Sequence, residues 1–159
     1  MLSVEAVVAF LEEHDFTLVT AESCTGGLIT SLLAEVRGSG QVLERGYVVY
    51  APRAKNECLG VSYDTIQRYG LSSAKVAEEM ALGALRNSQA VIAVSNTGLA
   101  EIEGEAGGVV YFGWAMHKGG QEQVITEKVR FLESRNEVRE AAARYALAKV
   151  PSVADFFCE

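Results

Sequence analysis

The fold is decided by residues 16–36, which read FTLVTAESCTGGLITSLLAEV. The first five, Phe16 to Thr20, are apolar or β-branched and predict a short buried strand. From Leu28 onward the apolar residues recur at intervals of three and four, which predicts a helix. A turn with two glycines, residues 21–27, joins the strand to the helix. A strand that runs through a tight turn into a helix is the repeating unit of α/β proteins.

The rest of the chain continues this alternation. Helices are predicted around residues 4–11, 62–69, 73–87 and 136–149, and strands around 47–50, 90–94, 109–114 and 121–132. Residues 95–98 are predicted to form a turn, and the helix at 136–149 is predicted to be the last. Helices alternate with strands first, and two adjacent strands follow. We therefore expect an α/β fold: a three-layer α/β/α sandwich with a mostly parallel, mixed sheet and an antiparallel edge.

The length of 159 residues, 49% of them hydrophobic, predicts one compact domain spanning residues 1–159. The net charge of −7 argues against nucleic acids and anionic membranes as partners, because both require a basic surface. No apolar run reaches the ~18 residues of a membrane helix, and the N-terminus lacks the pattern of a signal peptide. Three widely spaced cysteines predict neither disulfides nor a CxxC metal site. We expect a cytoplasmic protein that forms a homo-oligomer, a dimer being the commonest case.

Ligands of open α/β sheets bind where loops leave the carboxyl ends of the strands. Residues 21–27 and 95–108 are two such loops. In the first, the glycines let a ligand approach the main chain, and N–H groups at the helix start attract an anion or a developing oxyanion. Ser23 and Cys24 lie beside that helix end, so either is a candidate nucleophile. The alternative is structural: Ser23 or Thr25 caps the helix, and Cys24 fills a small space in the core.

A serine nucleophile needs a base. The chain has two histidines, His14 and His117, and neither falls in a loop that converges on Ser23. Lysine serves as a base when burial lowers its pKa toward neutrality. Lys55 follows the strand predicted to end at Tyr50, which places it near the end of a neighbouring strand. The alternative for Lys55 is a solvated helix lysine, as most lysines are.

The segment AESCTGGL, residues 21–28, resembles the signature of the CinA C-terminal-domain family, the nicotinamide-nucleotide amidases. Four further blocks follow in the order found in that family. They are ERGYVVY at 44–50 with Lys55 beyond it, LGV at 59–61 with SAKVAEEMALGA at 73–84, TGLA at 97–100, and the arginine-containing segment 135–139. The resemblance covers nearly the whole chain.

The resemblance implies a specific reaction, the hydrolysis of the carboxamide of nicotinamide mononucleotide to nicotinate mononucleotide and ammonia. By position, Ser23 would be the nucleophile and Lys55 the general base. Main-chain N–H groups near Thr25, Gly26 and Gly27 would hold the oxyanion. No metal or redox cofactor is implied.

The resemblance also assigns residues to the expected ligand, a small-molecule nucleotide. Thr97 and Gly98 would line the site. Arg135 would meet the substrate phosphate, a contact for which arginine is well suited. Tyr50 would orient Lys55 or stack on the pyridine ring.

Two segments depart from the pattern of the family. Ala51-Pro52 replaces the usual Ser-Asn after the tyrosine of the second block. The 95–108 loop is shorter and carries three glutamates in place of a glycine-rich, partly basic stretch. Carboxylates near a mononucleotide repel its phosphate. Two alternatives therefore stay open: a non-catalytic relative that binds a nucleotide or a protein partner, and a Ser-Lys amidase that acts on a less anionic amide.

Overall fold

The computed structural model of the chain describes residues 1–100, 104 and 107–159. The helices and strands, in chain order, are α1 (Val4–Glu13), β1 (Leu18–Glu22), α2 (Leu28–Ala34), the short 3₁₀ helix η1 (Ser39–Gln41), β2 (Leu43–Val48), α3 (Pro52–Leu59), α4 (Tyr63–Tyr69), α5 (Ala74–Arg86), β3 (Ile92–Gly98), β4 (Val109–Lys118), β5 (Gln121–Arg130), α6 (Arg135–Ala148) and α7 (Val150–Cys158). The strands form one mixed sheet in the order β2-β1-β3-β4-β5. β1 pairs in parallel with β2 and β3, and β4 and β5 complete the sheet with antiparallel pairings.

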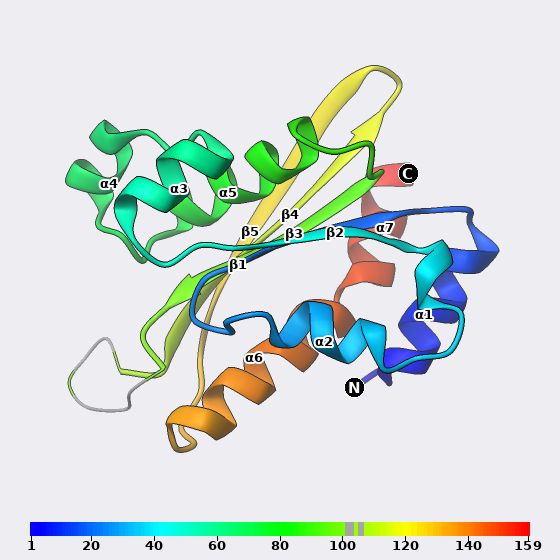
Figure 1. Ribbon diagram of the computed structural model, residues 1–159, viewed down its shortest axis with the longest axis horizontal. Helices are drawn as coiled ribbons and strands as arrows, with labels where there is room; N and C mark the ends of the chain where they lie inside the picture. The colour runs from blue at the N-terminus through cyan, green and yellow to red at the C-terminus, as the bar shows by residue number, and fades with distance from the viewer. Residues whose placement is uncertain (101–103, 105–106) are drawn as a thin grey trace.

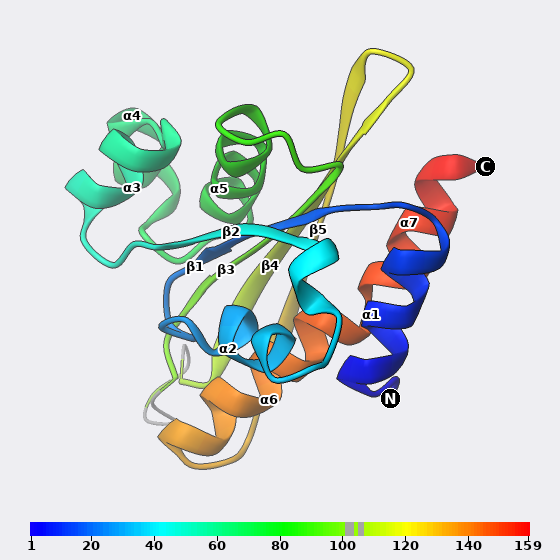
Figure 2. The same ribbon diagram turned by 45° about the vertical axis from the view of Figure 1, so that its right-hand side comes forward.

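The helices form two layers, one on each face of the sheet (Figures 1 and 2). Helices α1, α2, α6 and α7 cover one face, and α3, α4 and α5 cover the other. Each layer has a core of buried apolar side chains, with Trp114 and Leu147 in the first and Met80 and Leu85 in the second. The predicted three-layer α/β/α sandwich with an antiparallel edge is confirmed.

The position of β1 between β2 and β3 determines where a ligand can bind. From β1 the chain runs through α2 to β2, and from β2 it returns through α3, α4 and α5 to β3 on the other side of β1. The two connections lie on opposite faces of the sheet (Figure 2). Such a strand is a topological switch point, where a crevice opens beyond the carboxyl ends of the strands. The turn that follows β1, residues 23–27, lies at this point.

Capping and turn residues set the ends of several elements. The hydroxyls of Ser62 and Ser73 accept hydrogen bonds from the first N–H groups of α4 and α5. Pro52 occupies the first turn of α3, where an N–H group is not needed. Gly119 and Gly120, both at positive φ, form the hairpin turn between β4 and β5. The local chemistry of the sequence therefore accounts for these boundaries.

The structure corrects two predictions. Residues 95–98, predicted to form a turn, continue β3 to its end and pair with β4. Their polar side chains suggested a turn, but these side chains are buried and have hydrogen-bond partners: Ser95 donates to Ala77 O, Asn96 to Thr25 Oγ1 and Thr97 to Leu71 O. The helix predicted at 136–149 is not the last, because α7 follows it directly, with Pro151 in the first turn of α7.

The acidic part of the 95–108 loop, with Glu101, Glu103 and Glu105, lies outside the described residues. Within the described part of the chain, every helix is too short or too polar to cross a bilayer.

Candidate active site

Ser23 is the first residue after β1, at the switch point of the sheet. It is 7% exposed, and its N–H group donates to the main-chain oxygen of Asn96 in β3 at 3.2 Å. The chain then turns through two glycines at positive φ, Gly26 and Gly27, before α2 begins. A serine on such a strand-to-helix turn presents its hydroxyl at the end of the sheet, where a substrate can reach it.

Lys55 lies in the first turn of α3. This helix begins at Pro52, shortly after the end of β2, and so starts beside the carboxyl end of the parallel pair that β1 and β2 form. The Lys55 side chain is fully buried, and its Nζ donates a hydrogen bond to Ser23 Oγ at 2.9 Å. The structure thus brings together the two residues that the sequence analysis paired as nucleophile and base.

The Ala51-Pro52 departure leaves this placement intact. Ala51 is the N-cap of α3, in an extended conformation and without a side-chain hydrogen bond. Pro52 has the φ that a first helical residue needs. The Lys55 N–H group donates to Ala51 O at 3.1 Å, so the first turn of the helix forms normally.

Three uncharged oxygens accept hydrogen bonds from the Lys55 amine. Besides Ser23 Oγ, they are the main-chain oxygens of Tyr50 at 2.8 Å and Val49 at 3.3 Å. Burial lowers the pKa of Lys55 from 10.5 to about 8. A neutral amine has two N–H groups and one lone pair. When the two carbonyls accept the N–H groups, the lone pair is left for the Ser23 hydroxyl.

Cys24, the rival nucleophile, is a buried thiol whose Sγ donates to Asn96 Oδ1 at 3.3 Å. Burial raises the pKa of the Cys24 thiol from 9.0 to about 11, although the charges of Arg139 and Lys55 act in the opposite direction. The thiol is therefore protonated at neutral pH, whereas the thiolate is the reactive form.

Glu22, the last residue of β1, places its carboxylate at the start of α2. The side chain is fully buried and accepts hydrogen bonds from the N–H groups of Gly27, Ile29 and Thr30 and from the hydroxyls of Thr25 and Thr30, at 2.7 to 3.2 Å. A carboxylate here satisfies helix N–H groups and stabilises the positive end of the helix dipole. The helix end predicted to attract a ligand anion is occupied by a carboxylate of the protein itself.

The main-chain N–H groups assigned to the oxyanion also have acceptors within the protein. The N–H group of Thr25 donates to Asn96 Oδ1 at 3.4 Å, and that of Gly26 donates to Ser23 O at 2.9 Å. The N–H group of Gly27 donates to the carboxylate at the start of α2. In this arrangement all three N–H groups that the resemblance assigned to the oxyanion already have acceptors within the protein.

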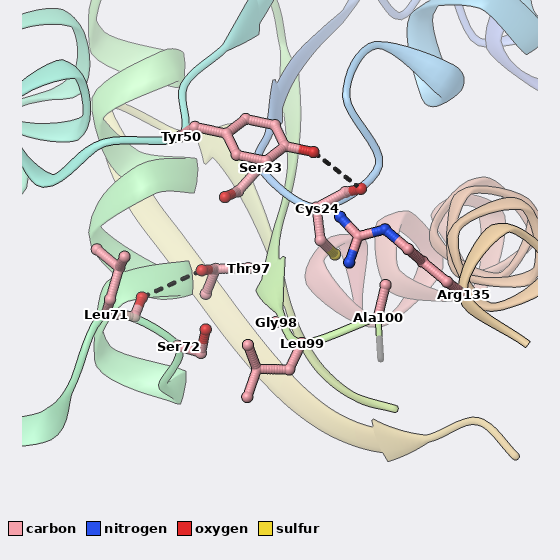
Figure 3. A pocket seen from close by; sticks show the side chains of 10 residues that line it. All are labelled: Ser23, Cys24, Tyr50, Leu71, Ser72, Thr97, Gly98, Leu99, Ala100 and Arg135. Atoms are coloured by element: carbon pink, nitrogen blue, oxygen red, sulfur yellow. Dashed lines mark hydrogen bonds between the residues drawn. The ribbon is translucent and has the colours of Figure 1, made fainter. Parts of the chain in front are cut away.

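A cavity of about 270 Å³ opens beside the serine (Figure 3). Its lining comes from five parts of the chain: Ser23 and Cys24, Tyr50, Leu71 and Ser72, residues 97–100, and Arg135. Tyr50, Thr97, Gly98 and Arg135, four residues predicted to contact the substrate, thus surround one cavity. Residues 25–27 are not part of the lining. Lys55 is not part of it either and is linked to it through its hydrogen bond to the serine.

Two hydrogen bonds shape this cavity (Figure 3). Thr97 Oγ1 donates to Leu71 O at 3.1 Å, which ties the segment before α5 to the end of β3. Tyr50 OH donates to Cys24 O at 3.4 Å, which holds the half-exposed ring beside the serine turn. Arg135 extends from the start of α6 toward the same turn (Figure 3).

The two histidines lie away from this site. The His14 ring shares a hydrogen bond with Phe10 O at 2.8 Å, and His117 lies in β4 opposite Glu122. Neither residue lines the cavity. Among the residues that the structure describes, no cluster of three His, Cys, Asp or Glu side chains is placed to hold a metal ion.

Three residues that shape the site have no role predicted from the sequence: Glu22, Asn96 and Arg139. An acidic residue at the end of a buried strand, directly before a glycine turn and a helix, is a local signal that points to Glu22. Asn96 and Arg139 offer no such signal, because their partners in the serine turn lie 71 to 115 residues away in the chain.

Comparisons with known proteins identify the family. The family model described as CinA C-terminal domain matches residues 2–153. The nicotinamide-nucleotide amidohydrolase PncC of Enterobacter agglomerans is 41% identical over 150 residues, which are 92% of this chain and 89% of that protein. A CinA-like protein of Akkermansia muciniphila is 40% identical over 148 residues, which are 91% of this chain and 35% of that protein. The chain thus spans most of the first relative and about a third of the second.

Solved structures give the same result. The crystal structure of the competence/damage inducible protein CihA from Agrobacterium tumefaciens matches with a TM-score of 0.87 and 33% sequence identity. The match covers 97% of this chain and 99% of that one. On its sequence, its fold and these relatives, the chain belongs to the CinA C-terminal domain family.

Proposed function

We propose that the protein is an amidohydrolase that converts nicotinamide mononucleotide and water to nicotinate mononucleotide and ammonia by a Ser-Lys mechanism. The observation that carries the proposal is the hydrogen bond of 2.9 Å from the buried Lys55 amine to Ser23 Oγ, at the edge of a cavity. A relative with 41% identity is named nicotinamide-nucleotide amidohydrolase, which supports the substrate class.

The reaction begins with the neutral form of Lys55. The amine takes the Ser23 proton while Oγ attacks the carboxamide carbon, which gives a tetrahedral intermediate and a lysine ammonium. The ammonium then passes a proton to the departing nitrogen, so that ammonia leaves and Ser23 carries a nicotinoyl ester. Val49 O and Tyr50 O hold the amine in place, so the proton moves along one short hydrogen bond.

Water completes the cycle by the reverse sequence of proton transfers. The neutral Lys55 amine takes a proton from a water molecule as the water oxygen attacks the ester carbon. The ammonium returns this proton to Ser23 Oγ when the ester bond breaks. The products are nicotinate mononucleotide and the original hydroxyl.

The oxyanion of both intermediates needs a donor, and we assign this role to the Cys24 N–H group. This group directly follows the nucleophile, the place from which hydrolases with a serine on a strand-to-helix turn donate. Among the described residues, the main chain supplies no acceptor to this N–H group. Thr25, Gly26 and Gly27 then shape the turn around the nucleophile instead of donating to the substrate.

The cavity residues divide the substrate between them. The half-exposed Tyr50 ring offers a face on which the pyridine stacks, while the Tyr50 main-chain oxygen orients Lys55. Thr97 and Gly98 form the wall at the end of β3. Arg135 pairs with the phosphate, for which a planar guanidinium supplies two parallel donors.

Ammonia release from nicotinamide mononucleotide by the purified protein tests the proposal. We expect Ser23→Ala to lower kcat by ~10³-fold or more while the fold is retained. Ser72→Ala removes another hydroxyl from the cavity lining and is expected to keep most of the activity. Full activity of Ser23→Ala would show that the serine is not the nucleophile.

The same assay separates the two alternatives that the acidic loop raises. A thermal shift with the nucleotide, but no ammonia, identifies a non-catalytic relative. Ammonia release from a neutral pyridine carboxamide, but not from the mononucleotide, identifies an amidase for a less anionic substrate. Either result would replace the proposed activity.

We also propose that residues 1–159 form one domain and that the protein is a cytoplasmic homodimer. One sheet with its two helical layers takes up the described residues, and several large apolar side chains, among them Val48, Leu132 and Phe156, are exposed. Two-fold dimers are the commonest oligomers of soluble proteins. Analytical ultracentrifugation is expected to show twice the mass of the chain, and a monomer at all concentrations would contradict the dimer.

A further inference from the structure

Arg139 connects α6 to the serine turn. Its Nε donates to Cys24 O at 2.9 Å and its Nη2 to Thr25 O at 3.2 Å, so one guanidinium holds two successive carbonyls. Its Nη1 donates to Asn136 Oδ1 at 3.3 Å. Tyr50 OH adds a donor to Cys24 O at 3.4 Å. A planar guanidinium reaches two neighbouring acceptors in a way that the single amine of lysine does not.

Asn96 holds the same peptide group from its other end. The group that joins Cys24 to Thr25 presents its carbonyl to Arg139 and its N–H to Asn96 Oδ1, at 3.4 Å. Asn96 is fully buried, and its Nδ2 donates to Thr25 Oγ1 at 2.7 Å, which orients the amide. A peptide group held at both ends does not rotate. The adjoining backbone, which carries the Ser23 side chain and the Cys24 N–H group, is therefore held in one conformation.

Glycine at position 26 leaves room for the guanidinium. A Cβ atom built on Gly26 would lie 2.9 Å from Arg139 Nη2, closer than such contacts normally come. The φ of Gly26 is +61°, which side-chain-bearing residues rarely adopt. A side chain at position 26 would therefore crowd the Arg139 guanidinium.

We propose that Arg139 is a positioning residue for the serine chemistry, an inference that rests on the proposed function. The guanidinium holds the Cys24 and Thr25 carbonyls toward α6, so that Ser23 Oγ stays in contact with Lys55. Arg139 is not among the residues that line the cavity, whereas Arg135 is. The charge of Arg139 therefore acts on the backbone of the turn, and contact with the substrate phosphate belongs to Arg135.

Steady-state kinetics of Arg139→Gln and Arg139→Lys test this role, with Arg144→Gln as the control. Arg144 lies on the same helix, and its guanidinium pairs with Glu140 at the surface. Because a misplacement of about 1 Å costs about 100-fold in rate, we expect both Arg139 variants to lose about that factor in kcat with KM nearly unchanged. The control keeps wild-type kinetics. A rise in KM at unchanged kcat would assign Arg139 to the substrate phosphate. A wild-type kcat in Arg139→Lys would show that a positive charge alone suffices. Either result overturns the proposal.

Labelling of Ser23 with a fluorophosphonate, followed by intact mass, gives a readout that needs no amide substrate. Labelling of the Arg139 variants is expected to slow as kcat does, and labelling at the wild-type rate would overturn the proposal. Gly26→Ala keeps the arginine but crowds it, and is expected to slow labelling as well in a protein whose circular dichroism is unchanged. A wild type that is labelled but releases no ammonia refutes only the proposed substrate, because the labelling rates still decide the role of Arg139. An unlabelled wild type refutes both proposals.

Discussion

Lys55 is unusual among the lysines of the chain because it is fully buried among uncharged oxygens. Desolvation alone favours the neutral amine, and the pKa of Lys55 falls from 10.5 to about 8. The lysine therefore becomes a usable base near neutral pH without a neighbouring positive charge to depress its pKa. In the proposed reaction the same two carbonyls hold the amine and the ammonium.

The pH dependence of the reaction follows from this pKa. About one tenth of Lys55 is neutral at pH 7, so kcat/KM is expected to rise toward pH 8, by up to about tenfold per unit, and to level off above it. Lys55→Arg is expected to be inactive at every pH, because a guanidinium stays protonated. Lys75→Arg, at the surface of α5, is the control. A flat profile of kcat/KM between pH 6.5 and 9 would exclude Lys55 as the base.

Cys24→Ala tests the rival nucleophile. Since burial raises the pKa of the thiol to about 11, the reactive thiolate is scarce at neutral pH and the variant is expected to keep most of the wild-type kcat. Iodoacetamide is expected to alkylate the exposed Cys58 and Cys158 before Cys24, with little loss of ammonia release. An inactive Cys24→Ala together with an active Ser23→Ala would exchange the two roles.

At the scale of elements, α2 depends on the carboxylate at its start. The helix has seven residues, too few to be stable by itself, and Glu22 satisfies several of its first N–H groups. The carboxylate also ties the helix to the end of β1, so it holds the serine turn between two rigid elements.

Glu22→Ala is expected to lower the free energy of unfolding by about 3 kcal/mol or more, because buried N–H and hydroxyl groups lose their acceptor. Ser73→Ala removes an ordinary N-cap from α5 and is expected to cost about 1 kcal/mol. Urea denaturation monitored by circular dichroism measures both. Equal losses in the two variants would mean that the carboxylate contributes no more than a normal cap.

The contact between α3 and α5 is expected to control the position of Lys55. A Cβ atom on Gly83 of α5 would lie 1.9 Å from Leu59 O, at the end of α3, so Gly83→Ala must push the two helices apart. Because Lys55 lies one turn before Leu59, we expect a lower kcat and a loss of about 1–3 kcal/mol in stability. Gly40→Ala is the matched control, since nothing lies within 4 Å of its added Cβ. Wild-type kcat in a destabilised Gly83→Ala would show that this contact does not place the lysine.

At the scale of the whole molecule, the site draws on both helical layers. Ser23 follows β1, Lys55 comes from the layer of α3, α4 and α5, and Arg135 and Arg139 come from α6 on the opposite face (Figure 1). The end of the sheet is where side chains from the two faces meet. A change that shifts the layer of α3, α4 and α5 against the sheet therefore changes the distance between Ser23 and Lys55.

The buried lysine also gives the folded molecule a pH dependence. Between about pH 8 and pH 10.5 the unfolded chain binds the Lys55 proton and the folded chain does not, so the free energy of unfolding rises with pH. Relative to Lys55→Met, the wild type is expected to gain about 2 kcal/mol between pH 7 and 9.5. Urea denaturation of both proteins across this range measures the difference. Parallel curves would mean that the lysine titrates normally.

Local patterns sufficed for most of the elements and for the candidate chemistry. The apolar spacing from Val4 to Leu11 predicted α1, and the AESCTGGL segment placed a serine on a turn between β1 and α2. The sequence also paired Ser23 with Lys55, through the resemblance of five blocks to one family. It did not predict that residues 95–98 extend β3, because their polar composition is typical of a turn and their burial depends on β1 and β4.

The sequence by itself therefore determined most of the helices and strands and which residue types stand at the end of β1. Only the tertiary structure decided that Lys55 is buried beside Ser23 and that Asn96 and Arg139 hold the serine turn. Helix and strand formation depends on neighbours within a few residues, which a local pattern records. Desolvation and long-range hydrogen bonds depend on segments that meet only after the sheet has assembled.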